Sequence, residues 1–351
     1  MKLLRILLII AAGITLQAAS GEAATPSREA QINLEGAQAL YHKADFAQAL
    51  KAFDHAMTLH EAWKTAAGHR ALCRWTLGDR RGAAADAREA AKLRPNSADS
   101  FVARGKARFV LKDYPGAIAD YEEALRLEPD FAAAHLGLGS VYSAQGDLLR
   151  AVKSLDSAVR SDSEFAAALL VRGAVRERLK EFARAVKDFN RVLEINPRFD
   201  WVYYYRAKNY RELKEYSRAR EDFDAFLQAH PDFEEALYLR SNVRFLLDDY
   251  SGAEMDLSRV IELNPKRGLA YSNRGMARVQ LGDRAGALSD LRKALELEPA
   301  KSAQIQAAID RIQAGGKDSG ASKPDESVEP SSGPDSSGQQ SQGTDQGFLI
   351  H

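Results

Sequence analysis

The side chains best suited to catalysis or metal binding are few in this chain, and their spacing forms no recognised site. The seven histidines occupy unrelated helical positions; six of them are His42, His55, His60, His69, His135 and His230. Cys73 is the only cysteine, which excludes an intramolecular disulfide and a cysteine-based zinc site. HExxH, GxSxG and a glycine-rich phosphate loop are missing from the sequence. We therefore predict no catalytic residue, no metal site and no cofactor.

The sequence does contain a regular pattern of opposite charges: six arginines are each followed by an aspartate sixteen residues later. The pairs are Arg70 and Asp86, Arg104 and Asp120, Arg172 and Asp188, Arg206 and Asp222, Arg240 and Asp256, and Arg274 and Asp290. Our hypothesis is a bidentate, partly buried ion pair between two antiparallel helices. The alternative is that the arginine row binds anions.

These pairs recur because the sequence repeats itself every 34 residues, from Ala30 to Lys301. We number each window from 1 to 34, so that the arginines above stand at position 7 and the aspartates at position 23. A second arginine row at position 11 has no obvious acidic partner, and we expect its stems to pack and its heads to be solvated. The predicted windows are 30–63, 64–97, 98–131, 132–165, 166–199, 200–233, 234–267 and 268–301.

Each window reads as two amphipathic helices joined by a turn near position 15. Position 20 is always alanine and position 8 is always small, which indicates a close crossing of the two helices. Position 16 is always acidic, as expected at the start of a second helix. In three windows a glycine precedes that acidic residue, at the point where the first helix must end: Gly78, Gly146 and Gly282.

This pattern resembles the tetratricopeptide repeat family from Ala30 to Lys301. The resemblance implies an all-α fold, in which antiparallel helix pairs stack into a right-handed superhelical solenoid. It also implies a concave groove lined by the first helix of each pair, and a partner that is a protein or an extended peptide. We expect a further helix over 302–314 to cap the last repeat.

In the family, first-helix positions 2, 5, 6, 9, 12 and 13 face the groove, and in repeats six to eight these positions become aromatic and polar. Such residues are typical of binding hot spots. The predicted peptide-binding residues are Trp201, Tyr204, Tyr205, Lys208, Arg211, Tyr238, Asn242 and Asn273. Asn242 and Asn273 match the two asparagines of carboxylate-clamp members, but the basic residues of that clamp are missing. The alternative for the cluster from Trp201 to Tyr205 is packing between repeats.

The two ends of the chain differ from the repeats. Residues 1–20 have the positive start, the apolar run and the small residues of an export signal, with cleavage expected after Ser20. The run is too short to span a bilayer, so we expect no membrane span in the mature chain. Residues 21–29 are a predicted leader, and residues 315–351 are rich in Gly, Ser, Pro, Asp and Gln, which is typical of a disordered tail.

Composition narrows the range of functions. Lys plus Arg and Asp plus Glu are both 49, so no overall charge favours nucleic acid as a partner. We predict an exported bacterial scaffold, periplasmic or secreted, that binds protein segments in its groove and is not an enzyme. The alternatives are a cell-envelope subunit that docks through its convex face and a lumenal adaptor similar to a co-chaperone.

Overall fold

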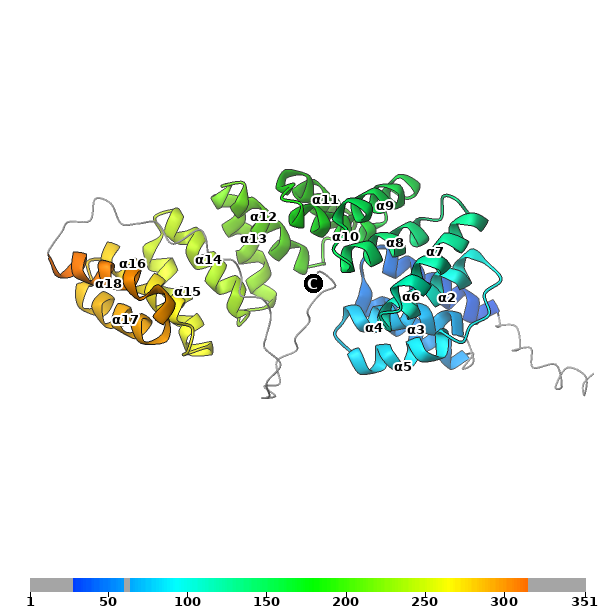
Figure 1. Ribbon diagram of the computed structural model, residues 1–351, viewed down its shortest axis with the longest axis horizontal. Helices are drawn as coiled ribbons and strands as arrows, with labels where there is room; N and C mark the ends of the chain where they lie inside the picture. The colour runs from blue at the N-terminus through cyan, green and yellow to red at the C-terminus, as the bar shows by residue number, and fades with distance from the viewer. Residues whose placement is uncertain (1–27, 60–63, 315–351) are drawn as a thin grey trace, which may run out of the picture. The chain divides into compact units, whose positions relative to one another are not determined.

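The computed structural model describes residues 28–59 and 64–314, and these residues contain helices and no strand. Figure 1 shows the helices following one another in antiparallel pairs. This confirms the predicted all-α class. The predicted export signal, the tail and most of the leader lie outside the described residues, and α2 begins at Arg28, within the expected leader. None of the described helices is long and apolar enough to cross a membrane.

Contacts divide the described chain into two compact units, and the boundary falls within α8, after Val141. The first unit holds three complete pairs and most of α8. Its helices are α2 (Arg28–His42), α3 (Phe46–Leu59), α4 (Lys64–Thr76), α5 (Arg80–Ala90), α6 (Ala98–Val110), α7 (Tyr114–Leu127) and α8 (Ala132–Ala144).

The second unit begins with the last turn of α8 and contains the remaining pairs. Its helices are α9 (Leu148–Ser161), α10 (Ala166–Arg178), α11 (Phe182–Ile195), α12 (Trp201–Glu212), α13 (Tyr216–Ala229), α14 (Glu234–Leu246), α15 (Tyr250–Leu263), α16 (Gly268–Gln280), α17 (Arg284–Leu297), the 3-10 turn η1 (Pro299–Lys301) and α18 (Ser302–Gln313). Helix α18 buries Ile305, Ile309 and Ile312 against α17, where the capping helix was expected.

All eight turns within the pairs use a left-handed residue at position 15. Glycine serves at three of them, with φ between 81° and 86°. The other five are non-glycine residues with φ near 60°: Ala44, Lys112, Lys180, Lys214 and Asp248. The next backbone N–H then reaches back across the turn, as from Asp113 to the carbonyl of Arg108 at 2.8 Å. The turn is therefore fixed by geometry, whichever residue occupies position 15.

The acidic residue at position 16 caps the second helix where it is aspartate. Asp79 accepts from the backbone N–H of Gly82 at 2.8 Å, and the other aspartates at this position make the same bond. Glu181 and Glu215 make no such bond to the helices that they precede. The extra methylene of glutamate places its carboxylate past the first turn.

The two helices of a pair cross closely where position 8 faces position 24. A Cβ atom on Gly105 would lie 2.6 Å from the ring of Tyr121, and one on Gly173 would lie 2.7 Å from the ring of Phe189. Both rings are almost completely buried. The small residue is therefore required by the aromatic side chain that packs against it.

The six predicted ion pairs are all present and all bidentate. In the fifth repeat, Arg172 donates from Nε and Nη2 to the carboxylate of Asp188, at 3.1 and 2.6 Å. The same geometry recurs in the other five pairs. Each aspartate is buried, and each guanidinium is mostly buried.

The expectation that the position-11 arginines have solvated heads is wrong. Arg176 donates to Asp188 at 2.8 Å, so one buried carboxylate serves two guanidinium groups. Arg74, Arg108, Arg244 and Arg278 contact the aspartate of their own repeats in the same way. Position 11 lies one helical turn beyond position 7, so both arginines reach the same acid.

The position-7 arginines also reach the preceding repeat. Arg70, Arg172 and Arg240 donate from Nη1 to Asp54, Asp156 and Asp224, which stand at position 25, at 2.8–2.9 Å. In two further repeats the acceptor at this position is Asn190 or Ser258. Each of these arginines therefore joins two consecutive repeats.

Candidate partner-binding face

The predicted binding residues lie on three consecutive first helices of the second unit. Trp201, Tyr204, Tyr205, Lys208 and Arg211 belong to α12 and follow the three- and four-residue spacing that places side chains on one face. Tyr238 and Asn242 belong to α14, and Asn273 belongs to α16. We call the surface formed by α10, α12, α14 and α16 the first-helix face.

The aromatic side chains of α12 pack mainly within the sixth repeat, and the Tyr205 ring lies 6.2 Å from the Phe189 ring of the fifth repeat. The Trp201 ring lies 5.2 Å from Phe226 of α13 and 5.5 Å from Phe233, which immediately precedes α14. Tyr204 contacts the same two rings at 5.2 and 5.4 Å. Trp201 is 8% exposed and Tyr204 is 9% exposed. Both side chains therefore pack into the core of the sixth repeat.

Lys208 belongs to a charged group that joins α10 to α12. Its Nζ lies 2.8 Å from Oε1 of Glu177 and within 6 Å of the centres of the Tyr204 and Tyr205 rings. Asn209 donates to Oε2 of the same glutamate at 2.9 Å and to the carbonyl of Tyr205 at 2.8 Å. The carboxylate of Glu177 is therefore held at both oxygens.

Sequence reasoning did not select Glu177 or Asn209 as site residues. Asn209 occupies position 10, where the other repeats carry a small apolar residue, and this polar substitution in an apolar position was the available signal. It is fully buried, and its Oδ1 has no hydrogen-bond partner among the described groups. An amide in this slot fixes the position of Glu177 at the expense of one unpaired acceptor.

A second polar group joins α14 to α16. Asn273 donates from Nδ2 to Oδ1 of Asn242 at 2.9 Å and to the hydroxyl of Tyr238 at 3.2 Å. The guanidinium of Arg267 stacks on the Tyr238 ring at 4.0 Å and donates to Glu234 and to Glu235. Burial raises the pKa of Tyr238, so its phenol remains protonated. The structure therefore brings Tyr238, Asn242 and Asn273 together.

Arg211 lies apart from these groups and donates from Nη2 to Glu212 of its own helix at 2.6 Å. The face as a whole offers half-buried amides, phenols and paired charges. These groups suit hydrogen bonding to a peptide better than bond-breaking chemistry. Within residues 28–59 and 64–314, no three His, Cys, Asp or Glu side chains are grouped to hold a metal ion.

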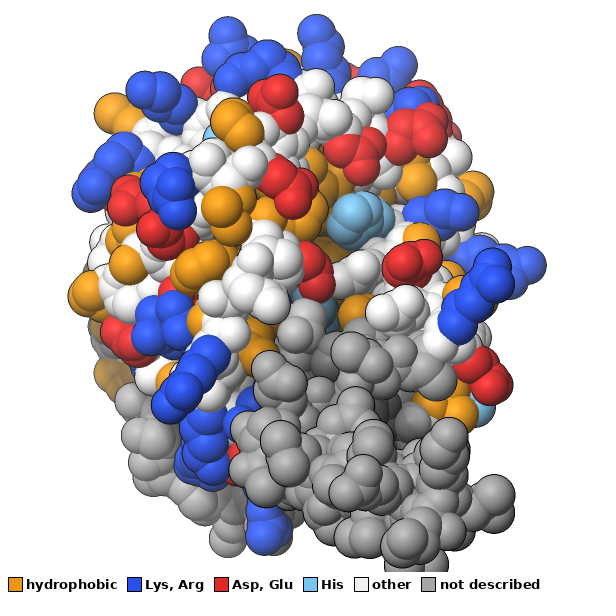
Figure 2. Space-filling view, turned by 90° about the vertical axis from the view of Figure 1, so that its right-hand side faces the viewer, with side chains coloured by type: hydrophobic (Ala, Val, Ile, Leu, Met, Phe, Trp, Pro, Cys, Tyr) orange, Lys and Arg blue, Asp and Glu red, His pale blue; other side chains and the backbone are white. Residues whose placement is uncertain are grey.

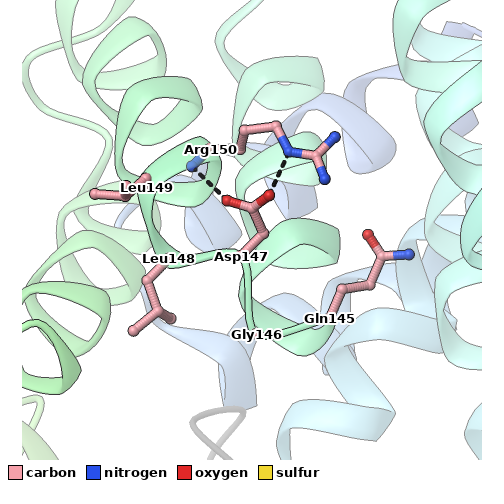
Figure 3. Close-up of a pocket in the computed structure, with 6 residues that line it drawn as sticks. All are labelled: Gln145, Gly146, Asp147, Leu148, Leu149 and Arg150. Atoms are coloured by element: carbon pink, nitrogen blue, oxygen red, sulfur yellow. Dashed lines mark hydrogen bonds and ion pairs between the residues drawn. The ribbon is translucent and has the colours of Figure 1, made fainter.

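A shallow depression in the second unit lies elsewhere, over the turn between α8 and α9. It is lined by the consecutive residues 145–150 (Figure 3). Asp147 caps α9 there by accepting from the backbone and side chain of Arg150, and Leu149 is 73% exposed. One short turn forms the whole lining, so the depression does not enclose a ligand.

Comparisons with known proteins place the chain among repeat proteins. Models described as "TPR repeat" or "Tetratricopeptide repeat" match residues 105–146, 136–198, 204–268 and 269–301. A search of proteins with curated descriptions found no match.

Solved structures share the fold at low sequence identity. YrrB, described as a TPR protein with an unusual peptide-binding site, is 20% identical over 54% of this chain and 97% of its own, with a TM-score of 0.51. A chain of the APC/C hetero-tetramer Cut9–Hcn1 is 12% identical over 87% of this chain and 59% of its own, with a TM-score of 0.59. PilF of Pseudomonas aeruginosa is 18% identical over 60% of this chain and 97% of its own, with a TM-score of 0.50. At these identities the likeness concerns the fold alone.

Proposed function

Because the chain belongs to the tetratricopeptide repeat family, we propose that its first-helix face holds an extended segment of a partner protein. Its repeats form a protein–protein interaction scaffold, and members of the family are typically non-catalytic. The finer proposal is that the partner binds to the polar groups on α10, α12, α14 and α16.

The observation that carries this proposal is the Tyr238–Asn242–Asn273 group. Asparagine offers both donors and acceptors, so it can pair with the N–H and the C=O of one peptide unit. Both amides are half-buried, and their mutual hydrogen bond spans two repeats. A peptide lying across α14 and α16 would therefore meet side chains that are already oriented, which lowers the entropic cost of binding.

Lys208 and Glu177 extend this surface to the fifth and sixth repeats. Their ion pair is about one-quarter exposed at each end, so a partner can reach both charges. The aromatic side chains beneath them are largely buried and support the polar groups from below. We propose that Trp201 and Tyr204 act by packing, whereas Lys208, Asn242 and Asn273 contact the partner.

We also propose that the chain is exported, on the basis of residues 1–20. The expected mature protein begins at Gly21. Amino-terminal sequencing of the protein recovered from outside the cytoplasm tests this step, and an intact Met1 would contradict it.

Site-directed photocrosslinking tests the binding face. The variant Asn242→p-benzoylphenylalanine should crosslink to defined segments of a partner protein. The matched control is Met255→p-benzoylphenylalanine on α15, a position that is 69% exposed on a second helix. A synthetic peptide of the crosslinked segment should then bind the wild-type chain and lose at least about tenfold in affinity with Lys208→Ala plus Asn242→Ala.

The opposite result identifies the alternative function. Crosslinks from position 255 alone, or a peptide affinity that the double substitution leaves unchanged, would reject the first-helix face. Such results would favour docking through the second helices, as in the cell-envelope subunit considered above.

A further inference from the structure

Five polar side chains of the first unit form one network, in which His69, Lys106 and Tyr41 are buried, Gln38 is half-buried and the side chain of Asp99 is 37% exposed. The members are Gln38 and Tyr41 of α2, His69 of α4, and Asp99 and Lys106 of α6. Lys106 Nζ lies 2.9 Å from His69 Nδ1, and His69 Nε2 lies 3.0 Å from Oδ1 of Asp99. Gln38 donates to the same carboxylate oxygen at 2.9 Å, and Lys106 lies 4.7 Å from the centre of the Tyr41 ring. The network therefore joins three consecutive repeats.

The network depends on an unusually close contact between α4 and α6. A Cβ atom on Gly68 would lie 2.3 Å from the carbonyl oxygen of Ala103, so the two backbones touch. Asp99 and Lys106 are seven residues apart, two turns along one face of α6. His69 is the neighbour of Gly68 and is therefore brought between them.

The hydrogen bonds assign the protonation of His69. A lysine ammonium only donates, so Nδ1 of His69 must accept, and Nε2 must carry the proton that it donates to Asp99. The imidazole is therefore neutral. It is 3% exposed, and Lys106 is 5% exposed. Burial and then the charge of Lys106 lower the pKa of His69, which agrees with this assignment.

Figure 2 looks onto the first unit and shows acidic and basic side chains interspersed on its described surface. Inside, the ionisable groups that act on His69 are few. They are Asp99 and Lys106 of α6, with Tyr41 of α2 next to Lys106 and Cys73 on α4 itself. From α3, the uncharged ring of Phe53 stacks on the imidazole, and Asp54 acts on Cys73. The network therefore has one carboxylate in contact with the imidazole to offset any added positive charge.

We propose that the Lys106–His69–Asp99 chain is an acid-sensitive joint between the first three repeats. A proton on Nδ1 of His69 removes the acceptor for Lys106 and places two cations in contact inside the core. Both side chains are almost completely buried, so water screens the repulsion between the imidazolium and the ammonium poorly, and the repulsion acts across the contact between α4 and α6. Acidification therefore separates α4 from α6 and loosens the joint.

Hydrogen exchange of the full-length protein tests the proposal. Between about pH 7.5 and about pH 5, after correction for intrinsic rates, amides of α4 and α6 should lose at least about tenfold in protection. Helices α14 and α15 of the same molecule, which lack such a chain, serve as the internal reference and should change by less than about twofold. Equal loss of protection in both regions would overturn the proposal, and so would constant protection in both.

Two variants test whether the charge of Lys106 contributes to the acid response of the joint. Lys106→Met removes the cation and keeps an unbranched stem, so the acid response of α4 and α6 should become smaller than in wild type, and the part caused by the burial of His69 should remain. His55→Gln changes an exposed histidine of the same unit and should retain the wild-type response. A full acid response in Lys106→Met would contradict the joint.

A measurement on the unmodified protein guards against a variant that fails to fold. Nuclear magnetic resonance of the labelled imidazoles should show His69 with its proton on Nε2 and a pKa below the ordinary value of 6.5. A proton on Nδ1 at neutral pH, or a pKa at or above 6.5, would refute the proposal whatever the variants do.

Discussion

Replacing Asp222 by alanine is expected to destabilise the sixth repeat by about 3–5 kcal/mol. Asp222 is 5% exposed and accepts from Nε and Nη2 of Arg206 at 2.7 and 2.6 Å. The only other protein acceptor recorded for that guanidinium is Oδ1 of Asn190, at 2.8 Å. The substitution therefore leaves a mostly buried cation with one neutral partner, which accounts for the size of the expected effect.

The chain supplies its own control for this experiment. The fourth repeat carries Leu138 and Ser154 at positions 7 and 23, and both the fourth and the sixth repeats carry tyrosine at position 11. The double variant Arg206→Leu plus Asp222→Ser gives the sixth repeat the residues of the fourth. Burial raises the pKa of Asp222, whereas the hydrogen bond and charge of Asp222 raise the pKa of Arg206, so desolvation and attraction oppose each other in this pair. We therefore expect the double variant to lie within about 1 kcal/mol of wild type.

Urea unfolding and hydrogen exchange of α12 and α13 measure the effect globally and locally. Repeat arrays can unfold in stages, so urea unfolding and hydrogen exchange can give different free energies. In that case the hydrogen-exchange protection of α12 and α13 is the deciding measurement. A cost below about 1 kcal/mol for Asp222→Ala would refute the buried-charge reasoning. A double variant as unstable as the single one would show that the ion pair contributes more than its desolvation costs.

Four further predictions follow from the fold. Lys180→Gly should stabilise the fifth repeat by about 0.5–1 kcal/mol in urea unfolding, because Lys180 has φ near 60°; a loss of stability would contradict the turn strain. Glu181→Asp should add about 0.5–1 kcal/mol by supplying the missing cap, and protection of the first amides of α11 should rise. Gly173→Val should lower the melting temperature, since its Cβ would overlap the ring of Phe189. Burial lowers the pKa of Lys106 from 10.5 to about 8, so Lys106 takes up a proton on unfolding between these values; the free energy of unfolding of wild type relative to Lys106→Met should therefore rise across that pH range.

Much of the fold could be predicted because the eight windows of one chain can be aligned with one another, position by position. The Arg–Asp pairs were predictable, since repeats that lack the arginine at position 7 also lack the aspartate at position 23. The second arginine contact, which five of these six aspartates make, was not predicted, because position 11 is not level with position 23 on the hairpin. The side-chain length of arginine allows it to reach an acid one turn away, and this reach is not visible in the repeat pattern.

The candidate site was less predictable, because the burial of a side chain depends on which other side chains pack against it in three dimensions. Trp201 and Tyr204 stand at positions that face the groove in the family, yet Phe226 and Phe233 cover them. Asn242 and Asn273 were expected on one surface, and the structure places them in direct contact.

The network around His69 escaped the sequence analysis for a related reason. Its members come from three repeats and occupy four different positions of the window, so no pattern unites them. The decisive residue is Gly68, whose missing side chain permits the contact between α4 and α6. Small residues were considered within hairpins and not between them.

The position-7 arginines give the array a direction. Each one donates backwards, as Arg172 does to Asp156, so a hairpin supplies the cation and its predecessor supplies the acceptor. Loss of the last hairpin leaves an acceptor that water can solvate, whereas loss of the first leaves a guanidinium deprived of a partner. During synthesis from the amino terminus, each emerging hairpin that carries this arginine finds the acceptor already in place, so we expect the repeats to assemble in order from the amino terminus.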